Sequence, residues 1–332
     1  MTLTQLRYIV SIADSGLNIT LAAERIHATQ PGVSKQLKQL EGELGFQLFA
    51  RKGKSLSAIT PAGQQVIARA RVILEQSRSI RSLAANLRGD VHGELVLLTT
   101  HTQARFVLPS AIASFRQKHP LVSLHLRPHG DAQVQSLFAN GQADLAIISS
   151  SGQVPLGGLA VPLYSWQRTV VVPRKHPLAS LNRRLRLGDL AGQPLVSYDS
   201  SLRPESSMRQ AFLTAGLQPR FACTSSDADL IKTYVRAGLG VGVLAEMAVR
   251  EEDSRDLVVL DAEHLLPKCT TWLVLRRDRV MRSYTLDLIG QLAPHLDRRD
   301  LQAALNGDAD PTWPEAPTWS TLSEDLPNPL AA

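Results

Sequence analysis

The first sixty residues repeat apolar side chains at the spacing of short helices. The first repeat ends at Gly16, where a left-handed residue can close a helix, and Asn18 follows as a candidate N-cap for the second. Inside that second helix, the small pair Ala22 and Ala23 lets a neighbouring helix approach closely. The pattern predicts a helix-turn-helix followed by a third helix.

The third predicted helix has an apolar face and a polar face. It begins with Thr29 or Gln30 as N-cap, has Pro31 in its first turn and stops at Gly45. The apolar stripe is Val33, Leu37, Leu40 and Leu44. The opposite face carries hydrogen-bond donors, namely Gln30, Ser34, Lys35 and Lys38. Glutamine and lysine reach base edges in the major groove, and serine and lysine also hold phosphates, so this face predicts a helix that reads DNA.

Residues 46–59 alternate apolar and polar side chains, as a β-hairpin does, around a basic turn. Arg51, Lys52 and Lys54 surround Gly53 in that turn. A basic turn alone is better explained as a solvated loop. Because this one directly follows a polar-faced helix, it predicts a wing that contacts the DNA backbone.

Several runs in this region resemble the LysR-type transcriptional regulators: Leu6-Arg7-Tyr8, Ala22-Ala23-Glu24, Thr29-Gln30-Pro31-Gly32-Val33-Ser34-Lys35-Gln36, Leu40-Glu41, Glu43-Leu44-Gly45 and Leu48-Phe49-Ala50-Arg51. The resemblance implies that the third helix enters the major groove of promoter DNA and that the protein binds as a dimer of dimers. RNA polymerase is a further possible partner. Pattern and resemblance together give these expected DNA contacts: Thr29, Gln30, Pro31, Ser34, Lys35, Lys38, Arg51 and Lys54.

A long helix opens at Thr60-Pro61, and its apolar positions form a seam one helix wide. The seam is Val66, Ala70, Ile73, Ser77, Ile80, Ala84 and Leu87. A helix of about 27 residues spans roughly 40 Å, more than one small domain covers. The seam therefore predicts dimerisation through this helix, the alternative being that it packs on its own chain.

From Gly93 onward, short β-rich runs alternate with helical patterns, which predicts parallel α/β sheets. Ligands of such sheets lie beyond the carboxyl ends of strands, where helix N-termini present free N–H groups. The run Thr99-Thr100-His101-Thr102-Gln103 stands at such a junction and predicts an oxyanion pocket, although one of its hydroxyls must cap the helix. Similar junctions at Ser149-Ser150, Tyr198-Asp199-Ser200-Ser201 and Thr224-Ser225-Ser226-Asp227 predict two lobes facing a cleft.

Runs in this region also resemble the cysteine-regulon activator (CysB-like) branch of the family: Thr99-Thr100-His101-Thr102-Gln103-Ala104-Arg105, Tyr164-Ser165-Trp166, Asp227-Ala228-Asp229-Leu230-Ile231-Lys232-Thr233-Tyr234-Val235 and Gly238-Leu239-Gly240-Val241-Gly242. The resemblance implies Thr100, Thr102, Gln103, Ser149 and Trp166 as effector contacts. The chain departs from the branch at Arg203-Pro204-Glu205, where relatives usually show Thr-Gly-Arg. Arg203 and Ser225 complete the expected effector set.

The expected fold is therefore α/β, with an all-α winged helix-turn-helix N-terminal domain and a two-lobed, periplasmic-binding-protein-like effector domain. The expected divisions are 1–60 for the DNA-binding domain, 61–92 for the linker helix, 93–300 for the effector domain and 301–332 for a disordered tail rich in proline. The expected function is activation of sulfur-assimilation or cysteine-biosynthesis genes in response to sulfate, thiosulfate, O-acetylserine or N-acetylserine. Sulfonate utilisation is the alternative.

Charge, cysteine and histidine positions and the start of the chain bear on the remaining functional classes. The net charge of +6 includes an acidic tail after residue 300, so the rest of the chain is more basic and suits a polyanionic partner. Cys223 and Cys269 have no metal or redox spacing, and His125 and His129 share no helical face. We expect no metal, cofactor or catalytic residue. The start of the chain has no export pattern, so we expect a cytoplasmic protein rather than a transport-type binding protein, the other candidates being enzymes on the same fold.

Overall fold

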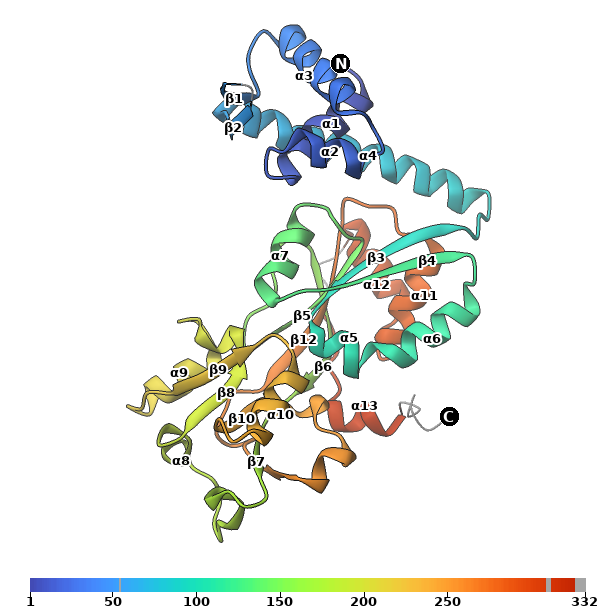
Figure 1. The fold of residues 1–332 in the computed structure, drawn as a ribbon. Coiled ribbons are helices and arrows are strands. Elements are labelled where there is room, and N and C mark those ends of the chain that lie inside the picture. The colour runs from blue at the N-terminus through green and yellow to red at the C-terminus, as the bar shows by residue number, and fades with distance from the viewer. Residues whose placement is uncertain (54, 309–311, 326–332) are drawn as a thin grey trace. The chain divides into compact units, whose positions relative to one another are not determined.

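The computed structural model describes residues 1–53, 55–308 and 312–325, and it divides the chain into two compact units (Figure 1). The first unit comprises residues 1–90 together with 278–282. The second comprises residues 91–277 and the chain from 283 onward. Each unit is built around hydrophobic clusters of its own.

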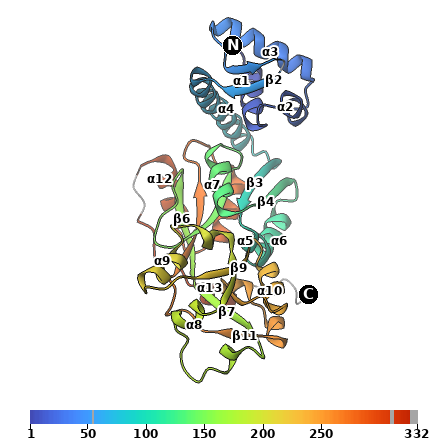
Figure 2. The same ribbon diagram turned by 60° about the vertical axis from the view of Figure 1, so that its left-hand side comes forward.

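The first unit is a winged helix-turn-helix continued by one long helix, as Figure 2 shows. Its elements are α1 (Leu3–Asp14), α2 (Ile19–Arg25), α3 (Gln30–Leu44), β1 (Phe49–Lys52), β2 (Ser55–Ile59) and α4 (Pro61–Leu87). β1 and β2 pair antiparallel to form the wing. The helix starts follow the expected caps, since the side chains of Asn18, Thr29 and Thr60 each accept a hydrogen bond from a backbone N–H of the first turn.

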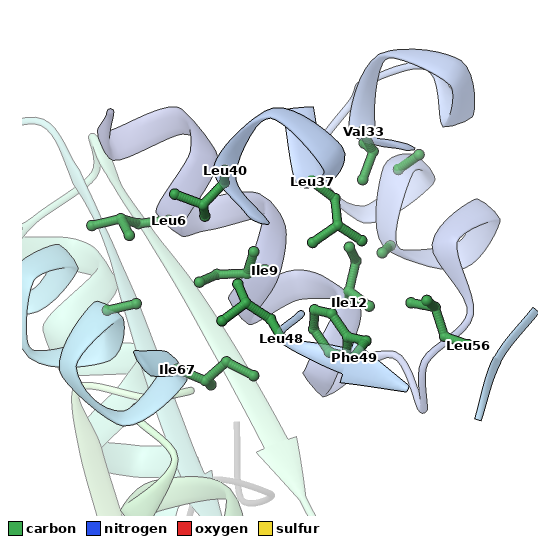
Figure 3. Packing of buried hydrophobic residues seen from close by; sticks show 13 residues of the cluster. Leu6, Ile9, Ile12, Val33, Leu37, Leu40, Leu48, Phe49, Leu56 and Ile67 are labelled. Atoms are coloured by element: carbon green, nitrogen blue, oxygen red, sulfur yellow. The ribbon is translucent and has the colours of Figure 1, made fainter. Parts of the chain in front are cut away.

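The core of the first unit lies where the three short helices meet the wing and the start of α4 (Figure 3). The fully buried side chains at its centre include Ile9, Ile12, Leu37, Leu40 and Phe49. The expected stripe of α3 faces this core, with the last position of that stripe, Leu44, only half-buried. Burial of one stripe leaves the donor face of α3 turned away from the core.

A buried carboxylate ties the wing to α3. Glu41 is 9% exposed, and its Oε1 accepts hydrogen bonds from the backbone N–H groups of Leu48 (2.9 Å) and Phe49 (3.3 Å). Its Oε2 pairs with the Arg51 guanidinium at 3.0 Å. Three donors compensate the cost of burying this charge, so the position of the wing depends on Glu41.

The long helix α4 divides its apolar side chains between the core and solvent. Val66 and Ala70, the first two positions of the predicted seam, pack into the core of the first unit, which corrects the expectation that they face a partner helix. Further along, Val72, Ile73, Ile80, Leu83 and Leu87 are exposed, and Ile73, Ile80 and Leu87 belong to the predicted seam. The core reaches only the first turns of a helix this long, which leaves the later positions uncovered.

A third face of α4 packs on residues 278–282, which belong to the same unit. Glu75 is 4% exposed and pairs with Arg279, with Oε2 2.7 Å from Nη2. Ser79 Oγ donates to the carbonyl of Asp278 (3.1 Å), and the Asn86 amide donates to that of Met281 (2.8 Å). A segment far along the chain thus completes the first unit.

The second unit contains two five-stranded sheets, each with helices around it. Lobe 1 has the strand order β4-β3-β5-β12-β6, and lobe 2 the order β11-β7-β10-β8-β9. The strands are β3 (Gly93–Thr99), β4 (Val122–Pro128), β5 (Leu145–Ser150), β6 (Leu159–Trp166), β7 (Arg168–Pro173), β8 (Pro194–Tyr198), β9 (Arg220–Ser225), β10 (Val241–Ala245), β11 (Leu257–Leu260) and β12 (Cys269–Leu275). The helices are α5 (His101–Phe106), α6 (Leu108–Lys118), α7 (Asp131–Ala139), α8 (Leu187–Ala191), α9 (Ser207–Thr214), α10 (Ala228–Arg236), α11 (Ser283–Leu292), α12 (Arg298–Asn306) and α13 (Trp319–Asp325).

The sheets are mixed rather than wholly parallel as expected. β3 runs parallel to β4 and β5, and β8 runs parallel to β9 and β10. β12 is antiparallel to β5 and β6, and β7 is antiparallel to β10 and β11. The chain crosses from lobe 1 to lobe 2 after β6 and returns after β11. The first strand after each crossing, β7 or β12, runs antiparallel to its neighbours in the sheet that it joins.

The expectation of a disordered tail from residue 301 is wrong for most of that segment. α12 continues to Asn306 and ends at Gly307, which has φ of +82° and closes the helix as a left-handed cap. Residues 312–318 lie along β6, and α13 follows them. Residues 309–311 and 326–332 lie outside the described part of the chain.

We expect Glu41→Gln to loosen the wing specifically. The amide retains one acceptor but loses the charge that binds Arg51 and two N–H groups, a loss of about 2 kcal/mol. Hydrogen exchange of residues 47–52 should then become roughly 30-fold faster. The control is Glu24→Gln at an exposed position of α2. Unchanged exchange in Glu41→Gln would show that Glu41 does not hold the wing.

Candidate effector-binding cleft and DNA-binding surface

A cavity of about 280 Å³ opens between the two lobes of the second unit. Its lining is dominated by hydroxyl and amide groups: Thr100, Thr102, Gln103, Gln135, Ser149, Ser150, Ser151, Gln153, Ser200, Ser201, Ser206, Ser207 and Ser226. The charged, aromatic and remaining side chains are His129, Asp131, Trp166, Arg168, Tyr198, Asp199, Arg203, Glu205, Ala245 and Cys269, with Gly130. The volume lies near the small end of the range for small-molecule sites.

The junction between β3 and α5 supplies one wall of the cleft. Thr100 is the N-cap of α5, and its Oγ1 accepts a hydrogen bond from the Gln103 N–H at 3.4 Å. Thr100 is therefore the residue that caps α5, so the hydroxyl of Thr102 is not needed as a cap. Thr102 uses that hydroxyl to donate to the Tyr198 hydroxyl of lobe 2 at 3.2 Å. Burial raises the pKa of Tyr198 to about 12, so this contact between the lobes joins two neutral groups.

Gln103 is held at both ends of its side chain. It is 2% exposed, its Oε1 accepts from the Tyr164 hydroxyl, and its Nε2 donates to Thr271 Oγ1 (3.4 Å) and Ser149 Oγ (3.5 Å). The Ser149 and Thr271 hydroxyls are themselves 3.0 Å apart. β5, β6 and β12 thus fix the amide against the wall of the cleft, where Gln103 and Ser149 are both part of the lining.

Trp166 lines the cleft and carries a buried indole N–H. The residue is 7% exposed and lines the cleft, and its Nε1 has no hydrogen-bond partner among the described residues. The Arg168 guanidinium lies 5.8 Å from the centre of the indole ring. A buried N–H without an acceptor costs about 1–3 kcal/mol, so this arrangement is suited to an acceptor that enters from the cleft.

Charges of both signs line the cleft. Arg168 and Arg203 are cationic and both half-buried. Asp131, at the start of α7, is the half-buried carboxylate, whereas Asp199 and Glu205 are exposed. Burial raises the pKa of the Asp131 carboxyl, and Arg203, the Ser200 hydroxyl and Arg168 partly oppose that shift. The cleft therefore offers directed donors to an anion without a large net positive charge.

The structure brings six of the seven expected effector residues to the same cleft: Thr100, Thr102, Gln103, Ser149, Trp166 and Arg203. Ser225 is not part of the lining. Its Oγ accepts a hydrogen bond from the Asp227 N–H at 3.0 Å in the turn before α10, and Ser226 lines the cleft instead. In that junction the first hydroxyl shapes the turn and the second faces the cavity.

Several residues of the cleft could not be identified from the sequence alone. Arg168 and Asp131 line it directly, and Tyr164 and Thr271 hold Gln103 from behind. Arg168 directly follows Trp166 and Gln167 at the crossing into lobe 2, a signal that could have found it. Thr271 comes from β12, more than 160 residues after Gln103, and no local pattern points to it.

The donor face of α3 is exposed as expected. Thr29, Gln30, Pro31, Lys35 and Lys38 are exposed and Ser34 is half-buried. Gln30 Nε2 donates to Ser34 Oγ at 3.2 Å, so these two side chains lie together at the start of the helix. The surface beside them is cationic because of Lys35 and Lys38.

The wing contributes one basic residue whose position is fixed. Arg51 is 29% exposed at its side chain and is paired with Glu41, so it contributes to holding the wing as well as to its charge. Lys52 is exposed at the end of β1. Lys54 lies outside the described residues.

The remaining observations concern metals, thiols and membrane spans. In residues 1–53, 55–308 and 312–325 no group of three metal-ligating side chains occurs, and Cys223 and Cys269 are free thiols. Burial raises the pKa of the Cys269 thiol, with Arg168 opposing. No helix of the described chain has the length and apolar character needed to cross a bilayer.

We expect Trp166→Phe to weaken effector binding with little effect on stability. The substitution removes the unpaired N–H, so affinity for an oxyanion should fall about tenfold. Loss of ring contact and removal of an unsatisfied donor oppose one another, so unfolding free energy should change by less than about 1 kcal/mol. Calorimetric titration with sulfate or N-acetylserine and thermal unfolding measure the two effects.

The matched control is Trp272→Phe, because Trp272 Nε1 already donates to Ser150 Oγ at 2.9 Å. This variant should lose about 1 kcal/mol of stability and keep its affinity within about twofold. Equal affinities of the wild type and Trp166→Phe would mean that the indole N–H does not meet the effector.

Comparison with known proteins agrees with both units. Residues 3–64 match the family model of the bacterial regulatory helix-turn-helix protein, lysR family, and residues 88–297 match the LysR substrate binding domain. The chain is 40% identical over 304 residues to the HTH-type transcriptional regulator CysB of Haemophilus influenzae, covering 92% of this chain and 94% of that protein. It is 38% identical over 305 residues to the HTH-type transcriptional regulator SsuR of Burkholderia cenocepacia, covering 92% and 99%. The solved cofactor-binding domain of the Cbl transcriptional regulator aligns with a TM-score of 0.60 and 34% identity, covering 65% of this chain and 94% of that domain.

Proposed function

This chain belongs to the LysR family of transcriptional regulators, and on that premise we propose that it controls sulfur-assimilation genes, as an activator, in response to a small oxyanion bound between its lobes. One observation carries the proposal: a single chain has both an exposed donor face on α3 and a hydroxyl-lined cleft, whose Trp166 N–H has no acceptor in the part of the chain that the structure describes. The similarity to CysB and SsuR supports the sulfur genes.

In this proposal α3 reads the operator. Gln30, Lys35 and Lys38 reach base edges and phosphates of the major groove, and Ser34 with the capping turn at Thr29 and Pro31 holds the helix N-terminus near a phosphate. The wing, with Arg51 and Lys54, contacts the adjacent backbone. Contacts to phosphate make binding strongly dependent on salt.

The exposed apolar face of α4 supports self-association. Val72, Ile73, Ile80, Leu83 and Leu87 recur along one helix, and a partner α4 would bury them as a coiled-coil seam does. We propose a dimer through α4 and a tetramer made from two dimers. RNA polymerase is the proposed partner at activated promoters.

The proposed effector is an oxyanion such as sulfate, thiosulfate, O-acetylserine or N-acetylserine. Thr100, Thr102, Gln103, Ser149, Trp166 and Arg203 surround the cavity and offer hydroxyl, amide, indole and guanidinium donors. Thr102 already contacts Tyr198 of the other lobe, so an anion placed beside it competes with or reinforces that contact. The effector acts by binding unequally to two arrangements of the lobes, which is the only way that binding shifts their populations.

Sulfonate utilisation is the second candidate. SsuR is nearly as similar to this chain as CysB is, and Arg203 adds a guanidinium to the cleft. A guanidinium fork suits a sulfonate or carboxylate group as well as a free sulfate. Titration with an alkyl sulfonate alongside sulfate and N-acetylserine distinguishes the two.

Two other functional classes, enzymes and transport-type binding proteins, fit these observations less well. The relatives are transcriptional regulators and not enzymes. A transport-type binding protein has no use for a winged helix-turn-helix. Since a regulator acts where the promoters are, we place the protein in the cytoplasm.

We expect Lys35→Ala and Lys38→Ala each to weaken binding to a promoter fragment. If the lysine contacts a phosphate, its loss lowers affinity for all DNA sequences and reduces the slope of log K against log salt concentration by about 1. If it contacts a base, its loss costs about 1–3 kcal/mol of binding free energy and relaxes sequence specificity. Fluorescence anisotropy at several salt concentrations separates the two, with exposed Arg220→Ala of β9 as control. Wild-type affinity in both lysine variants would reject α3 as the reading helix.

We expect Asp131→Asn to raise affinity for sulfate at neutral pH by about tenfold, because it removes a half-buried carboxylate from the anion's surroundings. The raised pKa of Asp131 means that this group protonates at a higher pH than an ordinary aspartate. Wild-type affinity should therefore rise as the pH falls from neutral, and the variant should show a flatter profile. Calorimetry across that range gives both profiles, with Asp300→Asn, at an exposed position of α12 outside the cleft lining, as control. Weaker binding by Asp131→Asn would show that the carboxylate supports the anion site.

A further inference from the structure

The free edge of β6 is covered by a segment from the end of the chain. We call residues 312–325 the tail segment. Its Pro317 carbonyl accepts a hydrogen bond from the Ser165 N–H at 2.8 Å, and Thr318 forms a parallel bridge with Ser165. At the other end of the strand, Trp313 Nε1 donates to the Ala160 carbonyl at 2.9 Å. All eight residues of β6 are buried, although it is the last strand of its sheet.

The tail segment closes this edge without extending the sheet. Pro314 and Pro317 have no N–H group, so the segment accepts from β6 but cannot continue a ladder to another strand. An edge that is covered in this way is protected from pairing with another chain. This accounts for the docking of residues 313–318 but not for the contact of the residue that follows them.

That residue, Trp319, packs on the interior of the effector domain. Its ring centre lies 5.4 Å from that of Tyr164, with the planes at 51°. Tyr164 is 2% exposed, and its hydroxyl donates to Gln103 Oε1 in the wall of the cleft. Burial raises the pKa of Tyr164 well above its usual value, so the phenol keeps its proton and remains a donor. A continuous set of contacts thus runs from the tail segment to the cleft.

The family model of the effector domain ends at residue 297, before the tail segment begins. The domain of the family is therefore complete without Trp319. In this chain an additional element contacts Tyr164, one of the residues that hold Gln103 in place.

We propose that Trp319 is a positioning residue of the effector site, which acts through Tyr164 on the orientation of Gln103 and so makes effector affinity depend on the tail segment. The inference rests on the proposed effector function of the cleft. Without the indole, the Tyr164 ring can turn and its hydroxyl leaves Gln103 Oε1. The amide is then free to rotate between Ser149 and Thr271.

The test is a double-mutant cycle in the full-length protein, with sulfate and N-acetyl-L-serine as calorimetric probes. Trp319→Ala should weaken binding about tenfold, and Trp319→Phe should stay within about twofold of the wild type because it retains a ring on Tyr164. In a Tyr164→Phe background, which has no hydroxyl to position, Trp319→Ala should add less than about twofold. Ser320→Ala, at an exposed position of the same helix, is the control.

Two results would overturn the inference. One is wild-type affinity in Trp319→Ala, even with a lowered melting temperature, which would give the indole a purely structural role. The other is an equal loss in both backgrounds, which would show that Trp319 does not act through the Tyr164 hydroxyl.

A second readout separates this inference from the effector proposal. If the wild-type protein binds neither probe, these two ligands are rejected as effectors, and hydrogen exchange of residues 101–106 decides the positioning role. Trp319→Ala should speed that exchange and Ser320→Ala should not. Equal exchange in the two variants would overturn the inference.

Discussion

The buried side-chain amide of Gln103 has to be hydrogen-bonded at both ends, and this requirement brings four elements of lobe 1 to one point. α5 carries the amide, β6 supplies the Tyr164 hydroxyl, and β5 and β12 supply Ser149 and Thr271. An unpaired buried amide would cost several times what each of these contacts contributes. The start of α5, with Thr100 and Thr102, is therefore presented to the cleft in one orientation.

The chemistry of the cleft follows from this rigidity. Under the proposed function, selection of an anion depends more on the direction of hydroxyl, amide and indole donors than on net charge, because the carboxylates of Asp131, Asp199 and Glu205 line the same cleft as Arg168 and Arg203. Directed donors distinguish oxyanions by shape and by the positions of their oxygens. The hydrogen bond between Thr102 and Tyr198 joins the lobes, so under the proposed function a group that meets the effector also affects lobe closure.

Local chemistry made much of this structure predictable from sequence. The caps at Thr29 and Thr60 mark the first turns of α3 and α4, and Gly45 ends α3 with φ of +78°. The donor-rich run after β3 indicated the cleft for the same reason, since a strand end and a helix start adjoin within a few residues. The exposure of the donor face of α3 followed from the burial of the opposite stripe.

Contacts between residues far apart in the sequence could not be predicted from such local patterns. Thr271 meets Gln103 only because β12 returns between β5 and β6 late in the chain, which also makes the sheet mixed. The proline-rich composition after residue 300 indicated disorder, but Trp313 and Trp319 find partners on β6 that no local spacing reveals. Ser225 was predicted as an effector contact, but its hydroxyl accepts a hydrogen bond from the Asp227 N–H within the turn before α10.

The central claim is that an effector bound in the cleft changes how α3 binds DNA. Hydroxyl-radical footprinting of a sulfur-gene promoter by the full-length protein, with and without each oxyanion, tests it most directly. The account predicts that at least one oxyanion changes the length or spacing of the protected segments, and that Trp166→Phe shifts this change to higher concentration. Identical footprints with every oxyanion that binds the cleft would contradict it.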